Sequence, residues 1–355
     1  MKPSEGIPPL ILDPAPETEL PPAASRLVRK PSWWRRGMML AGAVGLGFLL
    51  RSMSHTKWTT VVVRLGPLLP LTAAVAIGWM TVYARGLWVI IDGAVGWGRL
   101  IYNKIVGEAY NVAMPLGDVG GDPFRIADIA AELGTATAVR GIVLDRLVYA
   151  TSGFLFSAAS ATGTVWAFAL DSRIVHLLVA YTVVATVAAV GLFAFVTHSA
   201  SARLIGRLLR LAKVQLPQVP SPLPAATFMR ALGWNLLGRA GVWAEVALLL
   251  WGLGQPVRFD ALVATGALSS IAGILFTFIP NGLGVNEGAV VFALTVAGYG
   301  ESIGLAVGLA RRVRQLLLTA LGLVLHALWR PMRAGRTQLK EHRRAAAISS
   351  APAAL

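Results

Sequence analysis

The chain has 355 residues, of which 55% are hydrophobic and 14% are charged, and it contains no cysteine. Because soluble proteins average about 25% charged residues, this composition excludes an ordinary soluble domain and favours an integral membrane protein. The lack of cysteine excludes disulfides, thiolate metal sites and cysteine catalysis, and the five histidines show no zinc-binding spacing. The net charge of +15 does not indicate nucleic-acid binding, since the basic residues gather at the edges of apolar runs. We therefore expect an all-α polytopic protein without metal, cofactor or nucleic acid.

The first half of the membrane portion, about residues 37–200, is predicted to hold four full spans. A disordered Pro-rich tail, residues 1–36, precedes it, and the basic residues at the end of this tail place the N-terminus in the cytoplasm. The expected elements are, in order, the spans 37–50 and 66–90, the apolar but charge-dotted stretch 97–146, and the spans 147–170 and 174–196.

The second half, about residues 226–329, follows a basic joining segment at 202–224. In this segment Arg203, Arg207 and Arg210 recur at helical spacing opposite leucines, which is typical of an amphipathic helix on the cytoplasmic membrane surface. The expected elements after it are the span 228–253, the apolar run 261–300, the span 302–329 and a basic cytoplasmic tail at 330–355.

The apolar run 261–300 contains one charged residue, Glu287, directly after a backbone interrupted by Pro280, Gly282 and Gly284. Unpaired backbone groups and an ionisable side chain are both costly in the hydrocarbon core. Such a combination persists where it lines a polar cavity or binds something, so this stretch is the first candidate site.

The charge-dotted stretch of the first half repeats the pattern. In both places a glycine lies two residues after a proline and an acid lies seven residues after it, in Pro115-Gly117-Asp122 and in Pro280-Gly282-Glu287. Matching interruptions in two halves point to a transporter binding site. We predict two re-entrant-like hairpins that open from opposite sides, an inverted repeat and about eight membrane elements. A chance match between two Gly-rich loops is the alternative.

Three sequence blocks, taken in order, resemble the lysylphosphatidylglycerol synthase transmembrane (flippase-like) family. They are Gly120-Gly121-Asp122-Pro123-Phe124-Arg125, Leu144-Asp145-Arg146 and Ile279-Pro280-Asn281-Gly282-Leu283-Gly284-Val285-Asn286-Glu287. The resemblance covers about residues 65–329, and the stretch from Gly107 to Pro115 resembles the hopanoid-biosynthesis-associated branch of the family. Two departures are Asn281, where a glycine is common, and the crowded Arg311-Arg312-Val313-Arg314, in which Arg311 best fits the family's single arginine.

The resemblance implies a multi-pass protein of the bacterial inner membrane that moves a lipid between leaflets. A phospholipid or a polyprenyl- or hopanoid-type lipid would be the substrate. In bifunctional members a soluble aminoacyl-transferase domain follows the membrane part. We expect no such domain after this membrane part, and therefore no lysyl transfer from this polypeptide alone. A homo-oligomer or a partner from lipid biosynthesis is an open possibility.

Glu287 has two interpretations. In an apolar site its carboxyl would exchange a proton near neutral pH or bind a headgroup. The structural alternative is a buried ion pair with Arg311, Arg312 or Arg314 that only fixes helix packing. We favour function, because an ion pair buried for stability alone is usually no better than apolar residues.

Asp122 and Arg125 lie three residues apart at an expected helix start, where they could pair with each other. Gly120 and Gly121 would leave backbone N–H groups open at that helix N-terminus, which suits a phosphate, and Arg125 would add a bidentate contact.

Asp145 and Arg146 are sequence neighbours, so they point about 100° apart on a helix and cannot satisfy each other. Each needs a partner elsewhere, such as Arg140, Glu108 or an acid of the hairpin. A structural network and a lipid contact are equally consistent with the pattern, and the same holds for Glu108 and Asn111, which share one helix face.

The preferred hypothesis is a lipid translocase with its site between the two hairpins and no catalytic residues. Glycines would let the backbone approach the headgroup, arginines would neutralise phosphate, and acids would meet a cationic group or a proton. A membrane-embedded lipid-modifying enzyme and a non-transporting accessory subunit are the alternatives. The candidate substrate-binding residues are Glu108, Asn111, Gly120, Gly121, Asp122, Arg125, Asp145, Arg146, Pro280, Gly282, Gly284, Glu287 and Arg311.

Overall fold

The computed structural model describes residues 63–114, 119–199, 222–276, 279, 282 and 284–349, with side chains through residue 328. Several expectations lie outside these residues: the tail 1–36, the span 37–50, most of the joining segment 202–224, and Pro115 and Pro280. Within the described part the chain is helical and has no strand, as a polytopic helical membrane protein requires. The elements are η2 (Gly66–Leu68), α3 (Leu69–Ile90), α4 (Trp97–Ala113), α5 (Asp122–Leu133), α6 (Thr135–Ala167), α7 (Ser172–Thr197), α9 (Ala225–Gly252), α10 (Phe259–Leu275), α11 (Val285–Val296) and α12 (Glu301–Ser349).

Three stretches of the described chain are long and apolar enough to cross a membrane. They are Val63–Ile90, Thr135–Ala167 and Ser172–Thr197. The first and third confirm the predicted spans 66–90 and 174–196. The second begins at Thr135 instead of residue 147, because Gly134, with a φ of +76°, ends α5 and the next residue already begins α6. The outward side of α7 carries Leu177 and a row of exposed valines, which suits contact with lipid.

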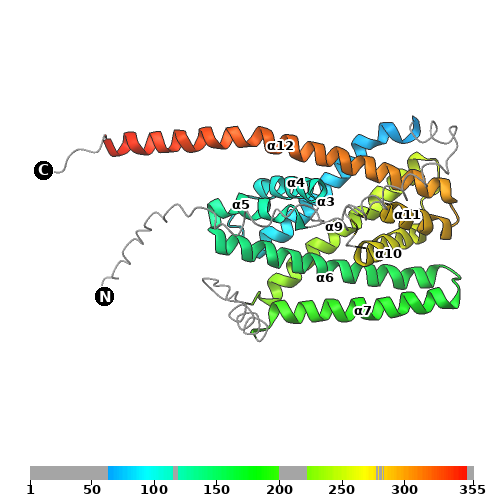
Figure 1. Ribbon diagram of the computed structural model, residues 1–355. Helices are drawn as coiled ribbons and strands as arrows, with labels where there is room; N and C mark the ends of the chain where they lie inside the picture. Colours follow the sequence, from blue (N-terminus) through cyan, green and yellow to red (C-terminus); the bar gives the residue numbers. More distant parts are fainter. Residues whose placement is uncertain are drawn as a thin grey trace, which may run out of the picture.

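Helices also form at the predicted spans 228–253 and 302–329, as α9 and the first part of α12. Both helices carry charged residues along their length. Such residues are costly where a helix faces lipid, so we expect them to face the interior of the bundle. α12 continues through Ser349, well past the expected end at residue 329. Arginine and alanine are the commonest residues of this continuation, and both favour helix. Figure 1 shows it projecting beyond the rest of the helices.

Two helical hairpins occupy the places where the sequence repeats its proline–glycine pattern. Hairpin 1 consists of α4 and α5, and hairpin 2 consists of α10 and α11; within each, the two helices pack against one another. In both hairpins a helix of 17 residues precedes one of 12 residues. At 1.5 Å per residue these helices are about 25 and 18 Å long, less than the roughly 30 Å hydrocarbon core.

The long helix α6 carries both hairpins. Its first half packs on hairpin 1, where Ile142 and Ala138 meet Ile129. Its second half packs on hairpin 2, where Gly163 meets Val263 so closely that a Cβ on the glycine would lie 2.8 Å from the valine side chain. Figure 1 accordingly shows α4 and α5 beside one end of α6 and α10 and α11 beside the other. α3, α9 and α12 complete the bundle, and each packs against at least one hairpin helix.

Candidate functional site

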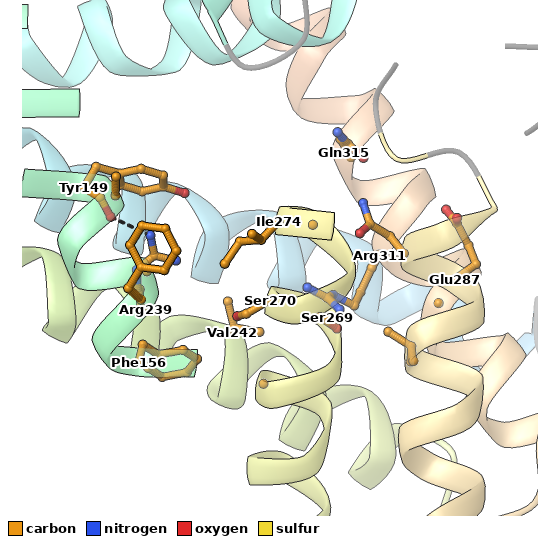
Figure 2. Close-up of a pocket in the computed structure, with 18 of the residues that line it drawn as sticks. Tyr149, Phe156, Arg239, Val242, Ser269, Ser270, Ile274, Glu287, Arg311 and Gln315 are labelled. Atoms are coloured by element: carbon orange, nitrogen blue, oxygen red, sulfur yellow. Dashed lines mark hydrogen bonds between the residues drawn. The ribbon is translucent and has the colours of Figure 1, made fainter. Parts of the chain in front are cut away.

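A cavity of about 550 Å³ lies where α6, α9, hairpin 2 and α12 meet (Figure 2). Val119, next to the turn of hairpin 1, also lines it, so both hairpins reach the same space. Five of its lining residues are arginines, and most of the rest of the wall is apolar or small. The polar side chains of the lining are Arg146, Tyr149, Arg239, Ser269, Ser270, Asn286, Glu287, Arg311, Arg312, Arg314 and Gln315.

A second cavity of about 310 Å³ adjoins the first. The two have Arg239, Arg311, Arg314 and Gln315 in common, and the second extends to Lys104 and Glu108 of hairpin 1. The Lys104 Nζ lies 4.0 Å from Glu108 Oε2 and also faces the Tyr83 and Tyr149 rings, at 5.4 and 5.2 Å from their centroids. Polar groups of both halves thus border one connected region.

Glu287 stands at the start of α11 and is 2% exposed. One carboxylate oxygen lies 2.6 Å from Arg312 Nε, and the other accepts the Gly284 backbone N–H at 2.9 Å. Glu287 therefore caps α11 and forms the buried ion pair that was the structural alternative. It also lines the large cavity, so this pairing does not remove it from the site.

Arg311 does not pair with Glu287. Its Nε lies 3.4 Å from Glu245 Oε2, outside hydrogen-bond geometry, while Arg314 Nε lies 2.6 Å from the other oxygen of Glu245. Glu245 is fully buried, so a single carboxylate of α9 serves two guanidinium groups of α12.

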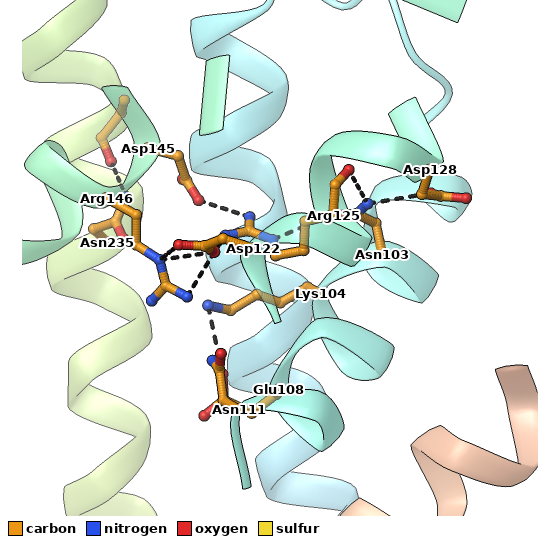
Figure 3. A network of polar contacts seen from close by, with 11 residues as sticks. Asn103, Lys104, Glu108, Asn111, Asp122, Arg125, Asp128, Asp145, Arg146 and Asn235 are labelled. Atoms are coloured by element: carbon orange, nitrogen blue, oxygen red, sulfur yellow. Dashed lines mark hydrogen bonds and ion pairs between the residues drawn. The ribbon is translucent and has the colours of Figure 1, made fainter. Parts of the chain in front are cut away.

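Four charged residues of hairpin 1 and α6 pair in a crossed arrangement (Figure 3). Arg146 binds Asp122 in a bidentate manner at 2.8 to 3.0 Å, and Arg125 binds Asp145 at 2.7 Å. The contact between Arg125 and Asp122 is longer, at 3.6 Å. The prediction that Asp145 and Arg146 find partners elsewhere is confirmed. The simple pairing of Asp122 with Arg125 is at most secondary, because α6 supplies a better partner to each.

Arg125 is the centre of this network and is almost completely buried. Its Nε donates to Asn103 Oδ1 at 3.2 Å, and the Asn103 amide donates to Asp128 at 3.1 Å. Arg125 also passes directly over Gly107, where a Cβ would lie 2.6 Å from the arginine side chain. Arg125 is thus enclosed by protein on several sides and does not line either cavity.

The expected open N–H group at Gly121 is not open. It donates to Asn111 Oδ1 at 2.7 Å, and the Asn111 amide donates to Glu108 at 3.2 Å. A Cβ on Gly121 would overlap the Gly107 carbonyl, so this glycine allows close approach of α4 and α5. Gly120 beside it is buried, in the turn before α5.

In hairpin 2, glycine is needed for its backbone conformation and not for close packing of helices. Gly282 and Gly284 have φ values of +56° and +78°, which only glycine adopts readily. They shape the turn that presents Asn286 and Glu287 to the large cavity.

The structure therefore divides the predicted site residues into two groups. Arg146, Glu287 and Arg311 line the large cavity and Glu108 lines the small one. The others that the structure describes lie in the hairpin turns or the crossed network and line neither cavity; they are Asn111, Gly120, Gly121, Asp122, Arg125, Asp145, Gly282 and Gly284.

Sequence reasoning did not select Arg239 and Glu245, which lie in α9. The available signal was their position inside a predicted span, since an ionisable residue within a membrane helix is a candidate functional residue. Arg239 donates to Ser152 Oγ and to the Tyr149 carbonyl, both at 2.8 Å, and stacks on the Tyr149 ring at 4.4 Å. Among the described residues, no carboxylate pairs with it.

The lining suits non-covalent binding of a polar, anionic group in a bundle with apolar flanks. No group of three or more His, Cys, Asp or Glu side chains in the described part is placed to hold a metal ion.

A comparison with protein families matches residues 38–322 to the lysylphosphatidylglycerol synthase TM region. Comparisons with curated proteins and with solved structures gave no match. The matched region contains both hairpins, both cavities and the crossed network. Since it covers well over half of the chain, this membrane protein belongs to the lysylphosphatidylglycerol synthase TM family, which links it to lipid handling.

Proposed function

We propose that the protein moves a lipid with a polar or charged headgroup between the leaflets of the bacterial inner membrane. The observation that carries this proposal is the arginine-lined cavity of about 550 Å³ that residues of both hairpins line. Polar groups placed inside an apolar bundle are costly, and a headgroup that crosses the membrane needs such groups along its path.

The shape of the cavity wall supports a lipid in preference to a small soluble solute. Two apolar residues of the lining, Ile274 and Val119, are 37% and 58% exposed, so the apolar part of the cavity wall reaches the protein surface. Acyl or prenyl chains would remain against this apolar edge while the headgroup enters. Hydrophobic burial would then hold the chains outside the polar cavity.

The two hairpins would act as re-entrant elements of an inverted repeat. Their equal pattern of 17 and 12 residues and their positions at opposite ends of α6 support this arrangement. With the basic ends of the chain in the cytoplasm, hairpin 1 would enter from the cytoplasmic side and hairpin 2 from the opposite side.

The test uses the full chain in proteoliposomes with a headgroup-labelled lipid and an impermeant quencher. We expect transfer above that of protein-free vesicles, and we expect Glu287→Gln to slow it by about tenfold or more, which corresponds to 1.4 kcal/mol. Gln retains an oxygen for the Gly284 N–H but loses the charge that meets Arg312. The matched control is Glu301→Gln, at an exposed position at the start of α12.

Equal rates of lipid transfer by the wild type and by Glu287→Gln would show that the Glu287 carboxylate has no role in transfer. Absence of transfer for phospholipid, polyprenyl and hopanoid-type lipids alike would overturn translocation. A chemically altered lipid recovered from the vesicles would instead indicate an enzyme.

A further inference from the structure

The charges around the two cavities do not balance. Arg146 is paired with Asp122, Arg312 with Glu287, and Lys104 with Glu108. The remaining cavity-lining cations are Arg239, Arg311 and Arg314, and among the described residues they have one carboxylate, Glu245. Three guanidinium groups against one carboxylate leave an excess of two positive charges. An uncompensated charge inside a membrane protein is strongly unfavourable, so an anion in the cavity would stabilise the protein.

Two of these guanidinium groups are available for a ligand. Arg239 is held by neutral partners only, Ser152 Oγ and the Tyr149 carbonyl. Arg311 forms no hydrogen bond within the described residues, and its ion pair with Glu245 is long, at 3.4 Å. Figure 2 shows the side chains of Arg239 and Arg311 on opposite sides of the same pocket. Guanidinium groups bind phosphate oxygens through charge-assisted hydrogen bonds, which are the strongest hydrogen bonds available here.

Neutral donors complete the lining between these arginines. The Ser269 hydroxyl is buried and has no hydrogen-bond partner, although buried polar groups nearly always have one. Ser269 and its neighbour Ser270 lie on the α10 side of the pocket. An unmade hydrogen bond in a cavity wall marks a position where a ligand oxygen would gain free energy.

We propose that these cavities bind a lipid whose headgroup carries two negative charges, of which a phosphomonoester is the simplest class. A phosphomonoester carries a charge of about −1.5 to −2 at neutral pH, which matches the excess, whereas a phosphodiester such as phosphatidylglycerol carries one negative charge. Glu245 is the internal counterion of Arg311 and Arg314 and competes with the phosphate for them. The proposal takes the entry of a lipid headgroup from the proposed function but requires binding alone, without transfer.

The test measures binding of defined lipids to the full chain in detergent, by native mass spectrometry and by the shift in thermal unfolding midpoint. The ligands are diacylglycerol phosphate, phosphatidylglycerol, phosphatidylcholine, uncharged diacylglycerol and free inorganic phosphate. We expect diacylglycerol phosphate to bind most tightly. Arg239→Gln and Arg311→Gln should each weaken its binding by about tenfold or more. The matched control is Arg230→Gln, an exposed arginine on the same helix as Arg239, which should bind as the wild type does.

Glu245→Gln gives the sharpest test because its effect has the opposite sign. Removal of the competing carboxylate should tighten binding of diacylglycerol phosphate, by about tenfold for a contribution of 1.4 kcal/mol. A misfolded variant would not bind its ligand more tightly, so this variant decides the matter even if Arg239→Gln fails to fold.

Equal binding of diacylglycerol phosphate and uncharged diacylglycerol would overturn the proposal, as would equal binding by Arg239→Gln and Arg230→Gln. Tighter binding of phosphatidylglycerol than of diacylglycerol phosphate would contradict the preference for a doubly charged headgroup. Binding of inorganic phosphate as tight as that of the lipid would show that the ligand need not be a lipid. Binding as expected without transfer in proteoliposomes would support this site and contradict the proposed translocation, so the two failures are distinguishable.

Discussion

The two hairpins have the same architecture and very different charge. Each has a 17-residue helix followed by a 12-residue helix. Hairpin 1 carries seven charged residues within its helices, whereas hairpin 2 carries Asp260 and Glu287 alone. The same backbone arrangement has therefore been given two kinds of side-chain chemistry.

The difference shows how each hairpin is held in place. In hairpin 1 charged side chains bind one another and α6, so its position depends on many polar contacts at once. Hairpin 2 packs mainly through apolar residues, with Leu262, Val290 and Leu294 in one core cluster with α9 and α12. Its carboxylate Glu287 contacts α12 beside the cavity. We expect hairpin 1 to act as a polar scaffold and hairpin 2 to hold Glu287 against Arg312 beside the cavity.

The largest effect on stability is expected from Arg125→Leu. This substitution leaves the buried Asp145 carboxylate without its partner, which costs about 3–5 kcal/mol in the free energy of unfolding. Denaturant titration in mixed micelles measures this change. The matched control is Arg173→Leu at an exposed position near the start of α7, which should change stability little.

The double variant Arg125→Leu/Asp145→Leu sharpens the first prediction. It removes both charges, so it should recover much of the loss, as buried ion pairs replaced by apolar residues often do. If the double variant is less stable than Arg125→Leu, then Asp145 has a structural role beyond its pairing with this arginine.

An intermediate effect is expected from Gly121→Ala. The new methyl group would overlap the Gly107 carbonyl and push α4 from α5, at a cost of about 1–3 kcal/mol for overpacking. Gly98→Ala, in the same hairpin with nothing near its Cβ, is the control and should be neutral or slightly stabilising. Equal thermal unfolding midpoints for the two variants would show that the turn of hairpin 1 is not closely packed.

The smallest effect is expected from Gly284→Ala in hairpin 2, where backbone conformation and not space is limiting. A φ of +78° costs an alanine about 1–2 kcal/mol. Gly288→Ala, one turn further along α11 with nothing near its Cβ, should instead stabilise the helix. The comparison uses thermal unfolding midpoints, and a similar shift for both would contradict the strain at Gly284.

The sequence predicted the helical membrane fold, the break in each half and the spans that became α3 and α7. These features follow from apolar run length and from proline and glycine positions, which act locally. The start of α6 was placed too late, because its first residues carry Arg140, Asp145 and Arg146 and so do not resemble a membrane span. Those charges are tolerated because Asp122 and Arg125 of α5 pair with two of them.

The residues of the site could be predicted from the sequence better than the ion pairs that they form. Sequence spacing suggested Asp122 with Arg125 and left three arginines open for Glu287, whereas the fold brings α6 against α5 and α9 against α12. Arg311 thus meets Glu245, far away in sequence, and not the nearer Glu287. Periodicity along one helix cannot reveal which residues face each other across two helices.

The unbroken course of α6 has a mechanical consequence. This helix of 33 residues holds hairpin 1 at one half and hairpin 2 at the other. If it tilts as a rigid lever, one hairpin is drawn away from the opposite wall of the bundle as the other is pressed toward it. Exposure of the arginines to one face of the membrane and their closure from the other would then be one movement, with no separate gate to synchronise.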